Sequence, residues 1–145
     1  MSPARRGDTA HAVSQENVEL VKTGYAAFVR GDLAGVIAVL DPEVEMADPF
    51  GFSTTDAYHG HDGFLQTVQD SFDAFEHYEI EPHEFLDAGD NVIVSVRLSG
   101  VGRGSGVAVD MPLFHVWTLR AGKAVQGRTF KTKEAALQAV GLAPR

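Results

Sequence analysis

The sequence predicts a single α+β domain, in which helices come first and an antiparallel meander of strands follows. Apolar residues recur at helical spacing in the first half of the chain, whereas from His77 onward they alternate with polar residues at the period of a strand. No internal repeat or interdomain linker interrupts the 145 residues, a length that suits one domain with a sizeable core. We therefore expect the helices to pack on one face of the sheet.

The first half of the chain is predicted to be a disordered tail followed by helices. Residues 1–13 mix Pro, Gly, Arg and Ala without periodicity, so the folded domain is expected to cover 14–145. Ser14 is the expected N-cap of the first helix. The expected elements, in chain order, are a helix at about 15–30, a short helix capped by Asp32, a strand at 44–47, a loop at 51–61 and a helix at about 63–75 capped by Asp62.

The second half is predicted to be four strands and a closing helix, separated by turns rich in Gly and Asp. The expected strands span 77–87, 91–101, 107–120 and about 124–131, and the closing helix begins after Thr132 and ends at Gly141. The strand at 107–120 is apolar on both faces in its second half, unlike a strand with one face in water. One face can pack on the helices. The other is expected to meet a second copy of the chain, which predicts a homodimer.

Composition excludes several classes of function. The formal net charge is −8 and the Lys and Arg residues are scattered, which argues against a nucleic-acid partner. The chain has no cysteine, so disulfides, thiolate metal sites and a cysteine nucleophile are excluded together. No apolar run approaches the length of a membrane span, and the N-terminus has no apolar signal core. We therefore expect a soluble cytoplasmic protein with no membrane partner.

Asp48 is the main candidate for a catalytic residue. It lies between the expected strand at 44–47 and Pro49, so its backbone is predicted to be extended. A carboxylate fixed at a strand end, with Met46 and Phe50 beside it, is in a place suited to a general base. The alternative is an Asp that starts an Asx-turn before the proline.

Several motifs along the chain occur in the order and spacing of one known superfamily. They are Gly31-Asp32-Leu33, the bend Ala47-Asp48-Pro49-Phe50-Gly51, Gly60-His61-Asp62-Gly63, the segment 114–125 and Glu134-Ala135-Ala136-Leu137. Over about residues 15–142 the chain resembles the nuclear transport factor 2-like superfamily, and within it the SnoaL-like and ketosteroid-isomerase-like group. The resemblance implies a cone-shaped curved antiparallel sheet wrapped around the N-terminal helices, a cystatin-like α+β barrel with an apolar pocket. This fold hosts isomerases, cyclases and proteins without known chemistry, so it does not settle the function.

The resemblance also implies roles for particular residues. Asp48 falls at the general base of the ketosteroid isomerases, which moves a proton between carbons next to a carbonyl. The tyrosine and the aspartic acid that stabilise the oxyanion in those enzymes align with Gly24 and Phe114, so Tyr25 and His115 are the nearest candidate donors. Periodicity combined with the cone shape predicts apolar residues that converge on the pocket with Asp48 at its wall. They are Phe28, Phe50, Phe64, Val94, Phe114 and Val116.

Other polar residues can have a structural role instead of a functional one. Tyr25 and His115 are first of all interpreted as core residues whose polar atoms are hydrogen-bonded. His59 and His61 flank a glycine without an evident third ligand, so they are read as surface residues and no metal site is predicted.

Two hypotheses for function follow. The first is a small-molecule enzyme without a cofactor, which transfers a proton in an isomerisation or cyclisation of an apolar, carbonyl-bearing substrate. Asp48 would be its general base, with Tyr25 or His115 as hydrogen-bond donor. The alternative is a module of the same fold that binds an apolar ligand or dimerises without chemistry.

Overall fold

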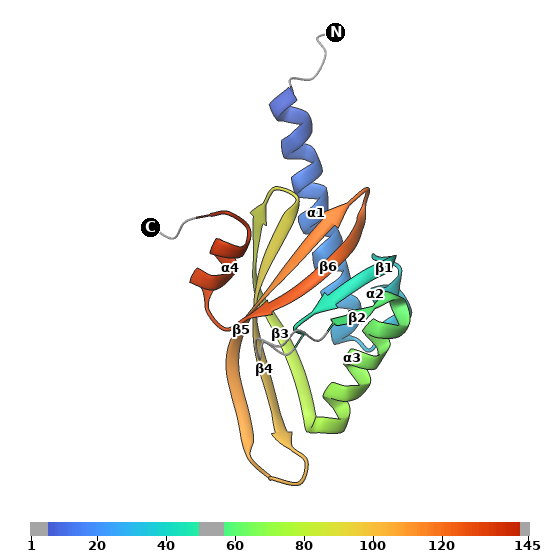
Figure 1. The fold of residues 1–145 in the computed structure, drawn as a ribbon, viewed down its shortest axis with the longest axis vertical. Helices are drawn as coiled ribbons and strands as arrows, with labels where there is room; N and C mark the ends of the chain where they lie inside the picture. The colour runs from blue at the N-terminus through green and yellow to red at the C-terminus, as the bar shows by residue number, and fades with distance from the viewer. Residues whose placement is uncertain (1–5, 50–56, 143–145) are drawn as a thin grey trace.

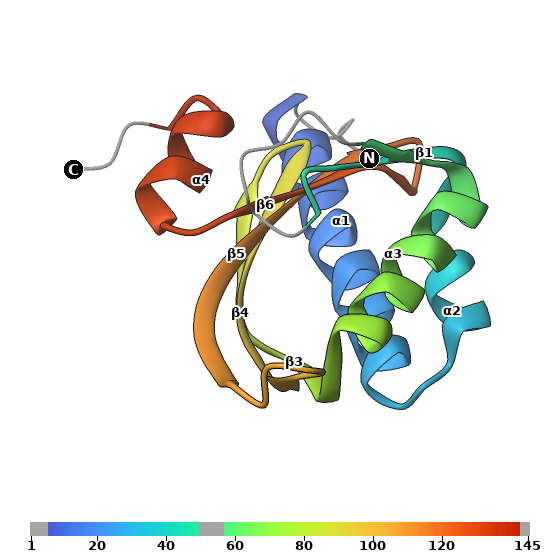
Figure 2. The same cartoon turned by 60° about the horizontal axis from the view of Figure 1, so that its bottom comes forward.

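The structure, a computed structural model, describes residues 6–49 and 57–142 and confirms the predicted α+β architecture. In the described residues, six strands form one curved, unclosed sheet (Figure 1). Helices α1, α2 and α3 lie together on one side of this sheet, and α4 lies on the other side (Figure 2). The elements are α1 (Arg6–Val29), α2 (Leu33–Ile37), β1 (Leu40–Ala47), β2 (Ala57–His59), α3 (Gly60–Ala74), β3 (Phe75–Ala88), β4 (Asn91–Gly102), β5 (Ala108–Arg120), β6 (Lys123–Phe130) and α4 (Lys133–Ala139).

The helix starts are partly as predicted. The Asp32 side chain caps α2 by accepting a hydrogen bond from the Gly35 N–H at 2.9 Å, and Thr132 caps α4 in the same way. Ser14 is not an N-cap, because α1 begins at Arg6 and includes most of the segment predicted to be a tail. The alanines in that segment have high helix propensity, a signal that is independent of hydrophobic periodicity. None of the described helices combines the length and the hydropathy that a membrane span requires.

The sheet joins the two halves of the chain through β1 and β6. Its strand order is β2-β1-β6-β5-β4-β3, and β3 to β6 form the predicted antiparallel meander. β1 pairs with β6 in parallel, with Met46 opposite Gly127. Part of the expected loop at 51–61 is instead β2, which pairs with β1, and α3 begins at Gly60 rather than after Asp62. The strand that precedes Asp48 is thus held between β2 and β6.

The core is divided between the two faces of the sheet. The larger cluster lies between the sheet and α1 to α3, and includes Tyr25, Val44, Phe64 and Val94. A smaller cluster on the opposite face is formed by Ile93, Val116 and Ala136, with Phe114, Phe130, Leu137 and Val140 packed against it. The second cluster explains within the chain why β5 is apolar on both faces, because α4 covers its outer side.

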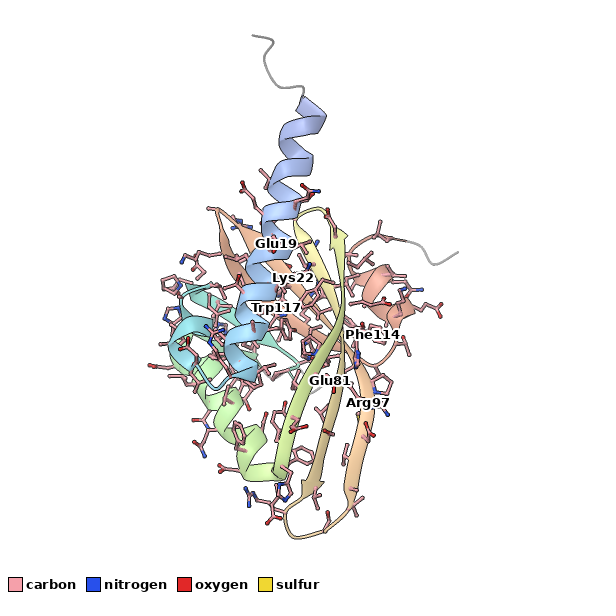
Figure 3. All side chains as sticks on the ribbon, turned by 180° about the vertical axis from the view of Figure 1, so that it is seen from behind. Glu19, Lys22, Glu81, Arg97, Phe114 and Trp117 are labelled. Carbon is pink, nitrogen blue, oxygen red and sulfur yellow. The ribbon has the colours of Figure 1, made fainter. Side chains whose placement is uncertain are left out.

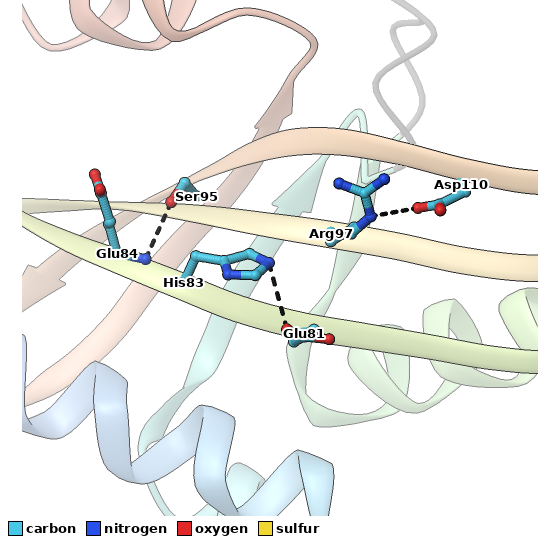
Figure 4. A network of polar contacts seen from close by, with 6 residues as sticks. All are labelled: Glu81, His83, Glu84, Ser95, Arg97 and Asp110. Atoms are coloured by element: carbon cyan, nitrogen blue, oxygen red, sulfur yellow. Dashed lines mark hydrogen bonds and ion pairs between the residues drawn. The ribbon is translucent and has the colours of Figure 1, made fainter.

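Beyond this cluster the outer face carries several polar contacts. Arg97 on β4 pairs with Asp110 on β5 at 2.6 Å, and both side chains are exposed. The Glu84 N–H donates to the Ser95 hydroxyl, and His83 lies 3.6 Å from Glu81 on β3 (Figure 4). Exposed ion pairs of this kind contribute roughly 0–1 kcal/mol each, so they add little to the stability of the sheet.

A homodimer through the outer face remains a prediction. Since α4 covers the apolar part, the contact would have to use the polar area around Arg97 and Asp110 together with α4. We expect sedimentation velocity at micromolar concentration to show a dimer, because an interface of roughly 1,600 Å² persists at that concentration. A single species at the 15.6 kDa monomer mass would contradict the prediction.

Candidate functional site

The candidate site is a cavity between α1, α3 and the concave face of the sheet. Its volume is about 640 Å³, within the range of roughly 300–1,000 Å³ that is typical of small-molecule sites. Apolar side chains make up most of the wall because α1 and α3 present their apolar faces to every second residue of β4 and β5. They include Leu20, Val21, Phe28, Phe64, Val68, Ile80, Leu98, Met111 and Leu113.

Three side chains form a polar group on this wall, which we call the Tyr25 cluster: Tyr25, His115 and Trp117. The Tyr25 hydroxyl oxygen lies 2.5 Å from His115 Nδ1, and Trp117 Nε1 donates a hydrogen bond to the same oxygen at 2.8 Å. His115 and Trp117 are two residues apart on β5, so both face the cavity. Tyr25 faces it from α1, one turn after buried Val21. The fold thus brings together residues about 90 positions apart in the sequence.

The Tyr25 cluster is electrically neutral. Burial lowers the pKa of His115 from 6.5 to about 4, because the imidazolium form loses its hydration. Burial also raises the pKa of the Tyr25 phenol above its usual value, although the hydrogen bond from Trp117 opposes that shift. At neutral pH the cluster therefore offers uncharged hydrogen-bonding groups inside an apolar wall.

Gly127 on β6 makes room for the Trp117 indole. A Cβ atom built at Gly127 would lie 2.6 Å from Cζ3 of the Trp117 ring, much closer than van der Waals contact. The two residues face each other across the antiparallel β5–β6 pair. The absence of a side chain at position 127 therefore sets the place of the indole N–H that reaches Tyr25.

Asp48 lies at the edge of the cavity. It follows β1 directly and is half-buried, and Asp48 itself does not line the cavity, whereas the next residue, Pro49, does. The Pro49 carbonyl accepts a hydrogen bond from the Thr129 hydroxyl at 2.8 Å, which ties this bend to β6. The φ angle of Asp48 is +46°, so the prediction of an extended backbone is wrong. Asp tolerates this left-handed conformation better than most residues, and such strain persists only where the surroundings fix it.

Asp70 is a carboxylate on the cavity wall that the sequence did not single out. It lies on α3, and both of its oxygens accept hydrogen bonds: Oδ2 from the Tyr58 hydroxyl at 2.9 Å and Oδ1 from Gln66 Nε2 at 2.7 Å. The contact with Tyr58 joins α3 to β2, and the contact with Gln66 lies within α3. Asp70 therefore has a structural role that is independent of any ligand.

The histidines at the start of α3 contact different partners. His61 Nε2 donates to the Leu40 carbonyl at 3.0 Å, whereas exposed His59 lies 3.9 Å from Glu45. Within the described residues there is no group of three or more His, Cys, Asp or Glu side chains placed to hold a metal ion.

Comparison with known proteins places the chain in a family. The model of the SnoaL-like domain matches residues 21–127, about three quarters of the chain. The chain belongs to the SnoaL-like domain family. This confirms the resemblance drawn from the motifs, and the matched segment of this SnoaL-like chain runs from α1 to β6. No curated protein matches it.

Solved structures support the same assignment. An NTF2-like protein from Burkholderia thailandensis is 30% identical, with 84% of this chain and 95% of that chain covered and a TM-score of 0.72. A protein from Jannaschia sp. assigned as a SnoaL-like polyketide cyclase is 26% identical, with 90% and 94% covered and a TM-score of 0.67. A protein of ketosteroid isomerase-like fold from Catenulispora acidiphila, in complex with trimethylamine, is 14% identical, with 86% and 93% covered and a TM-score of 0.66, and shows the fold alone.

The structure of this SnoaL-like chain brings together some of the predicted pocket residues. Phe28, Phe64, Tyr25 and His115 line the cavity. Val94 is fully buried in the larger core cluster without lining the cavity. Phe50 lies outside the described residues.

Phe114 and Val116 are not at the cavity, which corrects the prediction. Both lie on the outer face of β5 and pack with α4. In Figure 3, Trp117 lies beneath α1, whereas Phe114 lies toward α4. The physical reason is the alternation of a strand: the residues of β5 that reach the cavity are odd-numbered, among them Leu113, His115 and Trp117.

Trp117 is the functional candidate that the sequence analysis missed. Trp117 and His115 are two residues apart on one predicted strand, so the alternation of side chains already places them on the same face. Its indole N–H needs a partner when buried, which points to a polar neighbour, but nothing in the sequence identifies that neighbour as Tyr25.

Proposed function

We propose that this SnoaL-like protein is an enzyme that transfers a proton within an apolar, carbonyl-bearing small molecule, in an isomerisation or a cyclisation. The proposal rests on the cavity of about 640 Å³ between α1, α3 and the sheet. It is also in keeping with the family, one solved relative of which is assigned as a polyketide cyclase. An apolar wall with a few convergent polar groups is the usual form of a site for such molecules.

The observation that carries the proposal is the Tyr25 cluster on the cavity wall. Enolisation places negative charge on a carbonyl oxygen, and a hydrogen-bond donor held in a water-poor site lowers the barrier to that step. The ring of His115 faces the cavity and stays neutral, so it can donate a hydrogen bond without bringing a buried charge. Tyr25, on α1, is hydrogen-bonded to Nδ1 of this ring and so holds it in place.

Asp48 is the proposed general base. It precedes Pro49, which lines the cavity, and its left-handed backbone conformation lies in a bend that Thr129 anchors at the Pro49 carbonyl. A base at the edge suits a substrate whose carbonyl points inward to the Tyr25 cluster. The carbon next to the carbonyl would then lie toward Asp48.

A second candidate function is a module that binds an apolar ligand without chemistry. The observation in its favour is that Asp48 does not itself line the cavity, which leaves Asp70 as the lining carboxylate. Under this reading the Tyr25 cluster orients a ligand and does nothing more.

The cavity can be tested as the site by filling it. Val68 on α3 lines the cavity, so Val68→Phe should place a ring in it and lower binding and turnover of small enones and polyketide-like ketones by about 10-fold or more. The readout is proton exchange into deuterated water by NMR, together with calorimetric binding. Val29→Phe, the same substitution at an exposed position of α1, is the matched control.

The outcomes separate the two candidate functions. Exchange in the wild type that only Val68→Phe lowers supports the enzyme. Binding without exchange of any tested ketone supports the binding module. Equal activity in the wild type and Val68→Phe would show that the chemistry lies elsewhere.

A further inference from the structure

The hydrogen bonds of the Tyr25 cluster determine which nitrogen of His115 carries the proton. The indole N–H of Trp117 is a donor only, so the Tyr25 oxygen must accept in that contact. Tyr25 stays protonated because burial raises its pKa, and it has one proton to donate. Its other contact is His115 Nδ1 at 2.5 Å. When the Tyr25 hydroxyl donates its hydrogen bond there, Nδ1 is the acceptor. His115 is neutral, and its own proton is therefore on Nε2.

The Nε2–H of His115 has no protein acceptor among the described residues, where the imidazole makes its hydrogen bond and its ring contact with Tyr25. His115 lines the cavity and is partly accessible to it. A donor in such a place loses hydrogen-bonding energy when an apolar ligand displaces water from it, unless the ligand brings an acceptor. The lining around it is mainly apolar, so the acceptor has to come from the ligand.

We propose that the chain of hydrogen bonds from Trp117 through Tyr25 to His115 Nδ1 holds His115 as a donor, and that its Nε2–H binds a carbonyl oxygen of the ligand. The proposal rests on the proposed function in so far as the cavity must bind a ligand. It names His115 as the group that touches the carbonyl. Tyr25 and Trp117 are positioning residues that act through it.

This arrangement selects one class of ligand. A ketone, ester or quinone oxygen accepts a hydrogen bond from a neutral N–H, and the bond strengthens as the oxygen gains charge in an enolate. A hydrocarbon of the same shape leaves Nε2–H unpaired. A ligand ammonium at the same place would meet a donor rather than an acceptor. Discrimination between a carbonyl compound and its hydrocarbon analogue is the property to measure.

The tautomer can be measured without any ligand. In ¹⁵N-labelled protein at neutral pH, the long-range ¹H–¹⁵N spectrum of His115 should show a pyridine-type Nδ1 and a pyrrole-type Nε2. Trp117→Phe removes the donor that orients the Tyr25 hydroxyl, and it should shift His115 toward a mixture of tautomers. A protonated Nδ1 in the wild type, or a spectrum that Trp117→Phe leaves unchanged, would overturn the relay.

The carbonyl subsite can be measured with a matched pair of ligands, 9-fluorenone and fluorene. Wild type should bind the ketone about 10-fold more tightly than the hydrocarbon, which corresponds to one hydrogen bond of about 1.4 kcal/mol. His115→Phe keeps the ring and should abolish this preference, whereas His83→Phe, at an exposed histidine of β3, should keep it. The infrared carbonyl stretch of bound fluorenone should shift to lower frequency in the wild type and not in His115→Phe.

The binding results distinguish the carbonyl subsite from the proposed enzyme activity. Binding of both compounds without preference would overturn the subsite while leaving the cavity as a binding site. A ketone preference without turnover of any ketone would support the subsite and argue against the enzyme. Lack of binding by both compounds would overturn the subsite.

Discussion

Asp48→Asn is expected to lower the rate of proton transfer by roughly 10²-fold or more, the usual scale of general-base catalysis. The amide keeps the shape of the carboxylate and an oxygen acceptor, and Asn tolerates a positive φ as Asp does, so the backbone at +46° can be kept. Stability and ligand affinity should therefore change little. The measurement is turnover of the ketone that gives the fastest exchange, with urea unfolding and binding measured on the same two proteins.

Asp70→Asn is the matched control, because Asp70 is the carboxylate on the cavity wall. It loses charge-assisted hydrogen bonds from Tyr58 and Gln66, so we expect lower stability by about 1–2 kcal/mol with turnover largely kept. If Asp70→Asn abolishes turnover and Asp48→Asn does not, the base is Asp70 and the assignment of Asp48 is wrong.

His115 should make the protein less stable in mild acid. Its pKa is 6.5 in an unfolded chain and about 4 in the folded one, where burial disfavours the charged form. Between these values the unfolded chain binds a proton that the folded chain does not, so the free energy of unfolding falls as pH falls through this window. The loss is about 1.4 kcal/mol per pH unit and about 2 kcal/mol between about pH 7 and about pH 5.

His115→Gln tests this dependence because it removes the titrating group and keeps an acceptor for the Tyr25 hydroxyl. From about pH 7 to about pH 5, the unfolding free energy of the wild type should fall by about 2 kcal/mol more than that of His115→Gln. Tyr25 stays protonated across the window. The other ionisable groups are the same in both proteins, so the comparison isolates His115. His83→Gln, at an exposed position, should keep the wild-type slope. Parallel pH profiles for the wild type and His115→Gln would contradict the prediction.

Much of the fold could be predicted because hydrophobic periodicity and capping residues, which are local features of the sequence, agree with the final structure. The period of the apolar residues changes from helix to strand near His77, and β3 begins at Phe75. Asp32 and Thr132 are capping residues in the sequence and in the structure. The parallel pairing of β1 with β6 could not be predicted in this way, because no local signal connects strands so far apart in the chain.

The candidate site could be predicted only in part. Tyr25 and His115 were found as polar residues on apolar faces, but their direct contact depends on how α1 crosses the sheet. Phe114 was placed in the pocket on periodicity combined with the cone shape that the resemblance implies. In this chain the side chain on the cavity face of β5 is that of His115, because neighbouring residues of a strand point to opposite faces. An error of one residue therefore exchanges the two faces.

The pairing of β1 with β6 has a consequence for how the chain folds. Met46 meets Gly127 roughly 80 residues later, so the loop between them must close before this part of the sheet gains its hydrogen bonds. The meander from β3 to β6 joins neighbours in sequence and can form first. β1 can dock only when β6 is in place, and the bend at Asp48 is fixed at Pro49 by Thr129 of that same strand. We therefore expect the cavity edge to be completed late in folding, by contacts between the two ends of the domain.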